Sequence, residues 1–452
     1  MRLTVYKPFL IGILILLIIF GTNRVFQNKF IYNKTIGRYI IQYQNINGER
    51  KVVDKSFEGI TNENMVRWDA AHYLFIRDHS YDTKLAGGDY IFGFFPLFPL
   101  IWKISFLSPV GIGIFNYLLF VLGLIFIFKE LGHGLDKKEN ILKYILLLTL
   151  PGTVIFYIPY TEALFFIVIC IAFYGMLKNK YSYYFVGMFL CSLTRPSAVI
   201  IGASIVCKDI YLYLTGIEKE KLLKKIFRNI IPVVLGTMLI GLYQYSFDHT
   251  SLFNFQRVGA YWGHKLQIPR DLTDWSHEGF SMNIALIFLL IPTLICFLLK
   301  GIIVKGDTMD VKYPLFILST FYLVGIFLFI LLYQGGNLHG LSRYLLCTPF
   351  FFVVVIWGYQ KMGKSLLDER LALIVFPLFA ALFIYTLSPY MSKWSFYSLG
   401  LLILFLNYFY LFNVFSTAKL FNRLFFGSIV VVNIIWNAYL LNCYLNDGWI
   451  FA

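Results

Sequence analysis

The stretch from Val110 to Phe128 reads VGIGIFNYLLFVLGLIFIF, contains no charged residue and decides the class of fold. A helix needs about 20 apolar residues to cross the roughly 30 Å hydrocarbon core of a bilayer, so this stretch predicts a transmembrane helix. The composition of the whole chain agrees, because 59% of its 452 residues are hydrophobic and only 14% are charged. A soluble globular protein carries about 25% charged residues, and the composition therefore excludes that class.

Similar apolar stretches follow one another along the chain and predict an all-α, polytopic membrane protein. One of them, 183–214, is too long for a single helix and is interrupted at Arg195 and Pro196. Read as one pass, it would invert the side of every later loop. Two short helices place the basic loops on one side, as the positive-inside rule favours. We therefore expect about 13 transmembrane helices, the first of them an uncleaved signal anchor. The other expected spans lie near 8–22, 144–158, 160–177, 230–247, 281–299, 314–333, 345–360, 371–388, 396–415 and 425–441.

The net charge of +15 has a topological explanation in such a chain. The expected cytoplasmic segments hold 22 basic and 10 acidic residues, a net of +12, and the other side holds 17 basic and 14 acidic residues, a net of +3. This asymmetry places the N-terminus inside and the C-terminus outside. Two long loops, 23–109 and 248–280, then face outward from a single domain, 1–452. We expect an integral protein of a bacterial-type plasma membrane, or of the endoplasmic reticulum membrane in a eukaryote, without a nucleic-acid partner.

The first outward loop contains the stretch RWDAAHYLFI, residues 67–76, whose spacing predicts an interfacial helix with two different faces. A carboxylate beside an imidazole and a phenol at a membrane surface suits general-base work on a hydroxyl. The alternative is that Asp69 only caps or solvates this helix. The polar face holds Asp69, His72, Tyr73 and Ile76, and the apolar stripe holds Trp68, Ala71 and Phe75.

Two ionisable residues, Glu162 and Arg195, fall at membrane depth, where a charge is costly and normally faces a cavity or a partner. They form either a purely structural ion pair or a functional site in which the planar guanidinium of Arg195 binds a phosphate. Arg343 and Tyr344 precede a helix in a later outward loop. An arginine there favours an anion at the positive end of the helix dipole, or it serves as an interfacial anchor.

The rest of the sequence adds two candidate substrate-binding residues and excludes several kinds of site. His264 and Lys265, in the second outward loop, are further candidates for binding a substrate. Pro96 and Pro99 in GFFPLFPL forbid a regular helix through that stretch, so we expect an interfacial corner there. The six cysteines are scattered, and no metal-ligand spacing, P-loop or Rossmann glycine pattern occurs. We expect neither a metal nor a disulfide framework.

Five motifs between about residues 65 and 200, taken in order, resemble the PIG-V type mannosyltransferases of GPI-anchor assembly and their prokaryotic relatives. Ala70 and Ala198 depart from the pattern, because glycine is usual at both places. The matching residues are Trp68-Asp69 with His72-Tyr73, Phe94 to Pro99, Leu150-Pro151 with Phe156, Tyr160 with Glu162 and Leu164-Phe165, and Leu193-Thr194-Arg195.

The resemblance implies a GT-C type glycosyltransferase with a polyprenyl- or dolichyl-phosphate-sugar donor and a catalytic acid in the first outward loop. Asp69 matches that acid and would act as the general base in an inverting transfer of a hexose, most naturally mannose. The acceptor hydroxyl would belong to a glycolipid, a glycan or a protein. Arg195 or Arg343 would stabilise the departing phosphate without a metal. His72, Tyr73 and Glu162 would position the sugar or orient these groups.

Two other classes of protein compete with this interpretation. A transporter or lipid flippase would gather its ionisable groups on broken helices in two related halves, whereas this chain has its most conspicuous acid on a loop helix. A non-catalytic scaffold subunit would tolerate the loss of Asp69. The sequence favours the glycosyltransferase.

Overall fold

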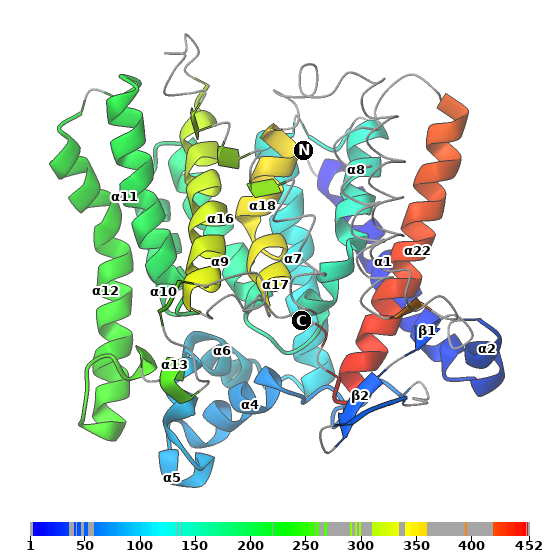
Figure 1. Cartoon of the computed structure of the whole chain (residues 1–452). Coiled ribbons are helices and arrows are strands. Elements are labelled where there is room, and N and C mark those ends of the chain that lie inside the picture. Colours follow the sequence, from blue (N-terminus) through cyan, green and yellow to red (C-terminus); the bar gives the residue numbers. More distant parts are fainter. Residues whose placement is uncertain are drawn as a thin grey trace.

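The chain forms a bundle of helices whose long members run side by side (Figure 1). Among the residues that the structure describes, five helices are long and apolar enough to cross a bilayer, and a bent pair makes a sixth crossing if it is counted as one span. The protein is therefore a helical membrane protein, as expected, while the number of 13 spans stays a prediction. The computed structural model describes residues 3–35, 40–41, 43–46, 49–52, 58–256 apart from 133, 137 and 219, 258–261, 266–268, 290–291, 294–295, 298–299, 310–333, 340–358, 394–395, 419–448 and 450. The expected spans 371–388 and 396–415, and most of 281–299, lie outside these residues.

The helices follow the expected spans closely where the apolar stretches are uninterrupted. The five long ones are α1 (Leu3–Phe26), α7 (Pro109–Leu131), α12 (Leu222–Asp248), α16 (Tyr313–Tyr333) and α22 (Lys419–Leu445). The other helices are α2 (Lys29–Lys34), α4 (Asp69–His79), α5 (Thr83–Ala86), η1 (Asp89–Gly93), α6 (Leu97–Ser105), α8 (Lys138–Thr149), η2 (Pro151–Tyr157), α9 (Glu162–Leu177), α10 (Tyr181–Ser192), α11 (Ala198–Leu214), η3 (Asn254–Gln256), α13 (Val258–Tyr261), α17 (Leu341–Leu346), α18 (Pro349–Val353) and the π-helical turn η6 (Val354–Gly358).

The stretch 183–214 forms two helices, α10 and α11, that meet at a turn containing Arg195, which confirms the expected interruption. The Tyr181 hydroxyl at the start of α10 donates a hydrogen bond to the Arg228 carbonyl, near the start of α12, over 2.6 Å. At the other end of α10, Arg195 contacts Glu162 at the start of α9. Asn229 donates to Asp209 of α11 over 2.9 Å, and its carbonyl accepts from Tyr184 of α10 over 2.8 Å, so the last turns of α11 lie beside the start of α10 and the two helices run in opposite directions.

Two expected spans are interrupted by a proline and are not single regular helices in the described residues. The expected span 144–158 is bent by 73° between α8 and η2, since Pro151 has no backbone N–H and cannot continue a helix. The Asn437 side chain of α22 donates to the Thr149 carbonyl over 2.7 Å at this bend. In the described part of the expected span 345–360, α17 ends at Leu346 and a second helical stretch, α18 followed directly by η6, begins at Pro349.

The expectation for Pro96 and Pro99 is wrong in part. The chain turns before Leu97, as expected of a corner, but α6 then begins at Leu97 and includes Pro99. A proline is tolerated there because the first-turn N–H groups of a helix have no intrahelical partner. The helices α4, α5 and α6 lie together beyond one end of the long helices (Figure 1).

Short strands lie at the same end of the bundle as this group of helices (Figure 1). Strands β2 (Tyr43–Ile46) and β3 (Glu49–Val52) form an antiparallel pair. Strand β1 (Ile40–Ile41) pairs in parallel with β4 (Trp394–Ser395), which brings two distant parts of the chain together.

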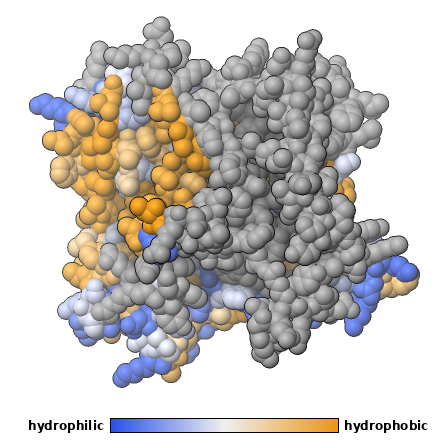
Figure 2. All heavy atoms as spheres, in the orientation of Figure 1, coloured by the Kyte–Doolittle hydropathy of each residue, from blue (hydrophilic) through white to orange (hydrophobic). Residues whose placement is uncertain are grey.

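The outer surface of the long helices is apolar. Figure 2 shows hydrophobic residues over the side of the molecule occupied by α11 and α12, with hydrophilic residues at both ends of this band. On α12 the exposed side chains include Val234, Leu235, Leu239 and Leu242. An exposed apolar surface of this extent suits contact with lipid.

Glycines allow α9 and α10 to approach one another closely. A Cβ atom at Gly187 would lie 2.4 Å from the Ala172 nitrogen, and one at Gly175 would lie 2.2 Å from the Tyr184 nitrogen. Small residues at such contacts are how membrane helices pack without a hydrophobic driving force. This contact fixes the position of α9, which carries Glu162.

We expect Gly187→Ala to destabilise the protein, because its methyl group would push the backbones of α9 and α10 apart at a cost of about 1–3 kcal/mol. A thermal unfolding curve of the purified protein in detergent should show a lower midpoint. Gly427→Ala is the matched control, since no atom lies within 4 Å of its added Cβ. Equal midpoints for the two variants would contradict the close packing.

Candidate active site

Four charged side chains from distant parts of the chain form one continuous ion network. Arg195 Nη1 lies 3.0 Å from Glu162 Oε1. Arg343 Nε also donates to Glu162 Oε1, and Arg343 Nη1 lies 2.7 Å from Asp69 Oδ2. The order Arg195–Glu162–Arg343–Asp69 alternates in sign, so the network as a whole is neutral.

The members of this network differ in their access to the surface. The Glu162 side chain is 0% exposed, both arginine side chains are 6% exposed, and the Asp69 side chain is 21% exposed. Burying ions is costly unless they are paired and hydrogen-bonded. Glu162 and Arg195 form the expected ion pair. The network also continues to Asp69, which is the most exposed of the four side chains and the one that a ligand reaches most easily.

Asp69 is held in place by the segment before it and by the last helix of the chain. Asp69 is the first residue of α4, and Trp68 before it has a φ of 52°, a conformation that is strained for a residue with a side chain. The Tyr444 hydroxyl of α22 donates to the Met65 carbonyl over 2.9 Å and accepts from the Arg67 N–H over 3.4 Å. These contacts orient the start of α4 toward the bundle.

The side-chain amide of Asn116, on α7, helps to position Glu162. The side chain of Asn116, on α7, donates to the carbonyls of Ile158 and Tyr160 over 2.9 Å each. It thereby holds the irregular segment that leads into α9. Glu162 is the first residue of α9, where the positive end of the helix dipole favours a carboxylate.

Aromatic rings surround the two guanidinium groups. The Arg343 guanidinium carbon lies 4.8 Å from the centre of the Tyr160 ring. The Arg195 guanidinium carbon lies 4.8 Å from the centre of the Tyr344 ring and 5.6 Å from that of Phe165. Cation–π contacts of this kind stabilise a charge where water is scarce.

His72 and Tyr73 pack beside the network without joining it. The His72 ring lies 4.5 Å from that of Phe94, and its burial lowers the pKa of the imidazole by more than the Asp69 carboxylate raises it. His72 is therefore neutral at pH 7. The Tyr73 hydroxyl lies 3.4 Å from Thr161 Oγ1, and burial raises the pKa of this phenol above its ordinary value. Both side chains offer uncharged hydrogen-bonding groups beside Asp69.

The structure brings together most of the residues expected at a site. The expected residues that gather are Asp69, His72, Tyr73, Glu162, Arg195, Arg343 and Tyr344. The candidates His264 and Lys265 lie outside the described residues. Tyr160, Asn116 and Tyr444 are not among the expected site residues. Tyr160 could have been identified from its place in the motif with Glu162. Asn116 could have been identified as an amide in an otherwise apolar stretch.

The acidic groups of the network are paired with arginines and are not grouped as metal ligands usually are. Within the part of the chain that the structure describes, no three His, Cys, Asp or Glu side chains lie close enough to hold a metal ion. Arg343 lies between Asp69 and Glu162 and contacts both carboxylates. A reaction without a metal stays a prediction.

We expect Glu162→Gln to destabilise the protein by about 3–5 kcal/mol, because it removes the anion that separates two buried guanidinium groups. Asp78→Asn is the matched control on α4, since it breaks an exposed ion pair, with Arg77 (2.7 Å), that contributes about 0–1 kcal/mol. Thermal unfolding in detergent measures both variants. A Glu162→Gln midpoint equal to that of Asp78→Asn would contradict the structural importance of the network.

Comparison with known proteins adds nothing to this geometry. No family model, curated protein or solved structure matches the chain. The functional assignment must therefore rest on the residues of the site and on the order of the motifs.

Proposed function

We propose that this protein is a membrane glycosyltransferase of the GT-C type. It transfers a hexose, most naturally mannose, from a polyprenyl- or dolichyl-phosphate donor to the hydroxyl of a glycolipid, glycan or protein acceptor. The observation that carries the proposal is the contact between Arg343 and Asp69, which places a surface-accessible carboxylate 2.7 Å from a buried cation. A base and a phosphate-binding cation are the two groups that such a transfer needs at one site.

The donor phosphate binds to Arg343 in place of the Asp69 carboxylate. Arg343 donates through Nε to Glu162 and through Nη1 to Asp69. The bond to the fully buried Glu162 keeps the guanidinium in position, while the bond to the partly exposed Asp69 is the one that a ligand can replace. A phosphate and a carboxylate compete for the same planar donor group, so binding of the donor releases Asp69.

Asp69, once released, acts as the general base. It accepts the proton of the acceptor hydroxyl as that oxygen forms a bond to the anomeric carbon from the face opposite the phosphate. The bond between the anomeric carbon and the phosphate oxygen breaks, and the lipid phosphate leaves with both electrons. Arg343 and Arg195 stabilise its negative charge, and the anomeric configuration is inverted.

The neighbouring polar groups position the two substrates. Neutral His72 and the Tyr73 hydroxyl lie on the same helix as Asp69 and can hydrogen-bond sugar hydroxyls without adding charge. The rings of Tyr160 and Tyr344 lie against the arginines and limit access of water to them. Exclusion of water favours transfer to the acceptor over hydrolysis of the donor.

We expect Asp69→Asn to abolish transfer, because the amide keeps the shape of the side chain but cannot accept the proton. A general base contributes a factor of about 10²–10⁴ to the rate. The assay uses purified protein with polyprenyl-phosphate mannose, an acceptor library and a chelator, so that it also tests for dependence on a metal.

Asp78→Asn is the control for the same helix and should retain full activity. Product formation by Asp69→Asn at the rate of the unaltered protein would refute the assignment of the base. Transport of a lipid-linked sugar without any new covalent product would instead support a flippase.

The site is proposed to lie on the extracytoplasmic side of a plasma membrane or of the endoplasmic reticulum membrane. The positive-inside distribution of charge supports this side, and α4, α5 and α6 all lie at one end of the bundle (Figure 1).

We expect a cysteine at Leu85, a position 65% exposed on α5, to react with a membrane-impermeant maleimide added to whole cells. A cysteine at Leu223, 71% exposed near the start of α12, should react only after the membrane is opened. The opposite pattern would reverse the proposed topology.

A further inference from the structure

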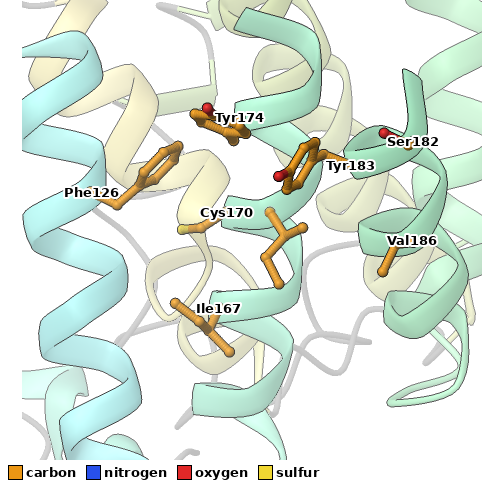
Figure 3. Close-up of a pocket in the computed structure, with 8 residues that line it drawn as sticks. Phe126, Ile167, Cys170, Tyr174, Ser182, Tyr183 and Val186 are labelled. Carbon is orange, nitrogen blue, oxygen red and sulfur yellow. The ribbon is translucent and has the colours of Figure 1, made fainter. Parts of the chain in front are cut away.

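An apolar groove lies on the side of the bundle, near the end of α9 opposite Glu162. Its volume of about 660 Å³ falls within the range of about 300–1,000 Å³ that is typical of ligand sites. Its walls belong to α7, α9 and α10 (Figure 3). The side chains that line it are Phe126 of α7, Ile167, Cys170, Ile171 and Tyr174 of α9, and Ser182, Tyr183 and Val186 of α10.

The groove has the dimensions and lining of a site for a hydrocarbon chain. From Ile167 to Tyr174 the helix α9 rises about 10 Å, at about 1.5 Å per residue, which is less than the roughly 15 Å depth of one leaflet of the hydrocarbon core. Val186 on its rim is 47% exposed and faces the apolar surroundings of the bundle. An apolar chain suits such a groove, because most of the side chains that line it are apolar.

One end of the groove is both aromatic and positively charged. The rings of Tyr174 and Tyr183 meet edge to face at 5.1 Å. Lys180 Nζ lies 5.8 Å from the centre of the Tyr183 ring. Lys178 is neutralised by Glu130 at 2.7 Å, whereas Lys180 has no such ion pair among the described residues. This end therefore presents a positive charge where a lipid phosphate would lie.

We propose that the groove binds one acyl chain of an anionic glycerophospholipid, whose phosphate lies against Lys180. This lipid is distinct from a substrate at the Asp69 site. The 16 residues of α9 extend over about 24 Å, and Glu162 with its arginines lies at the other end of that helix. A lipid phosphate at Lys180 is therefore in the leaflet opposite the ion network, and the inference does not depend on the proposed enzymatic activity.

The test is titration of the delipidated full-length protein with dioleoyl phosphatidylglycerol or dioleoyl phosphatidylcholine, with native mass spectrometry to count bound lipids. We expect about fivefold tighter binding of the first phosphatidylglycerol, because a lysine near an anionic headgroup contributes about a factor of five. Lys180→Gln should remove this preference. Val186→Trp should fill the groove and weaken the binding of both lipids at least tenfold.

Leu122→Trp is the matched control, because Leu122 lies on α7, is 43% exposed and does not line the groove. It should bind both lipids as the unaltered protein does. Unchanged lipid binding by Val186→Trp, or a phosphatidylglycerol preference that persists in Lys180→Gln, would overturn the proposal. Displacement of phosphatidylglycerol by a lower concentration of polyprenyl phosphate would also overturn it and assign the groove to an isoprenoid chain. If Val186→Trp does not fold, the Lys180→Gln result decides.

Discussion

A buried carboxylate needs cations beside it, and Glu162 meets this requirement with two arginines. Arg195 comes from the turn between α10 and α11, and Arg343 comes from α17. Because both must reach the same carboxylate oxygen, the pairing fixes three distant segments of the chain relative to one another. Arg343 then extends the constraint to Asp69 and so ties the loop helix α4 to the bundle.

The segments that carry the three paired side chains are all interrupted or short. Arg195 lies in a turn, Glu162 follows an irregular segment, and Arg343 lies on a helix of six residues. Irregular backbone at membrane depth needs hydrogen-bond partners from the protein. The amides of Asn116 and Asn437 supply them to the segment before α9 and to the bend after α8. The polar residues of otherwise apolar helices therefore support the site without touching its charges.

The sequence predicts the parts of this arrangement better than their pairing. Uninterrupted apolar stretches such as 110–128 were sufficient to place helices, and the interruption at Arg195 was correctly expected because the stretch is too long for one pass. The bend at Pro151 was missed because hydropathy does not register a missing N–H group. The expectation that Pro99 prevents a helix is wrong because a proline in the first turn breaks no backbone hydrogen bond, and the sequence pattern did not show that α6 begins at Leu97.

Most of the contacts between the charged side chains could not be predicted from the sequence. Asp69, Glu162, Arg195 and Arg343 are each recognisable as unusual, but their partners lie far away in the chain. Their pairing follows from the path of the helices between them. Nothing in a local pattern identifies Tyr444, whose hydroxyl positions the segment before Asp69 from near the other end of the chain.

The extent of the network argues for a role beyond stability. One arginine is enough to pair a buried glutamate, and a well-packed apolar replacement for a buried ion pair is often as stable. This protein instead buries two guanidinium groups and directs the second of them toward Asp69, which is 21% exposed. In the proposed function an anion takes the place of that carboxylate while Glu162 still holds Arg343, and the released charge of Asp69 lies beside the bound anion. A stabilising ion pair does not need this accessible end, whereas a site that binds a phosphate and removes a proton does.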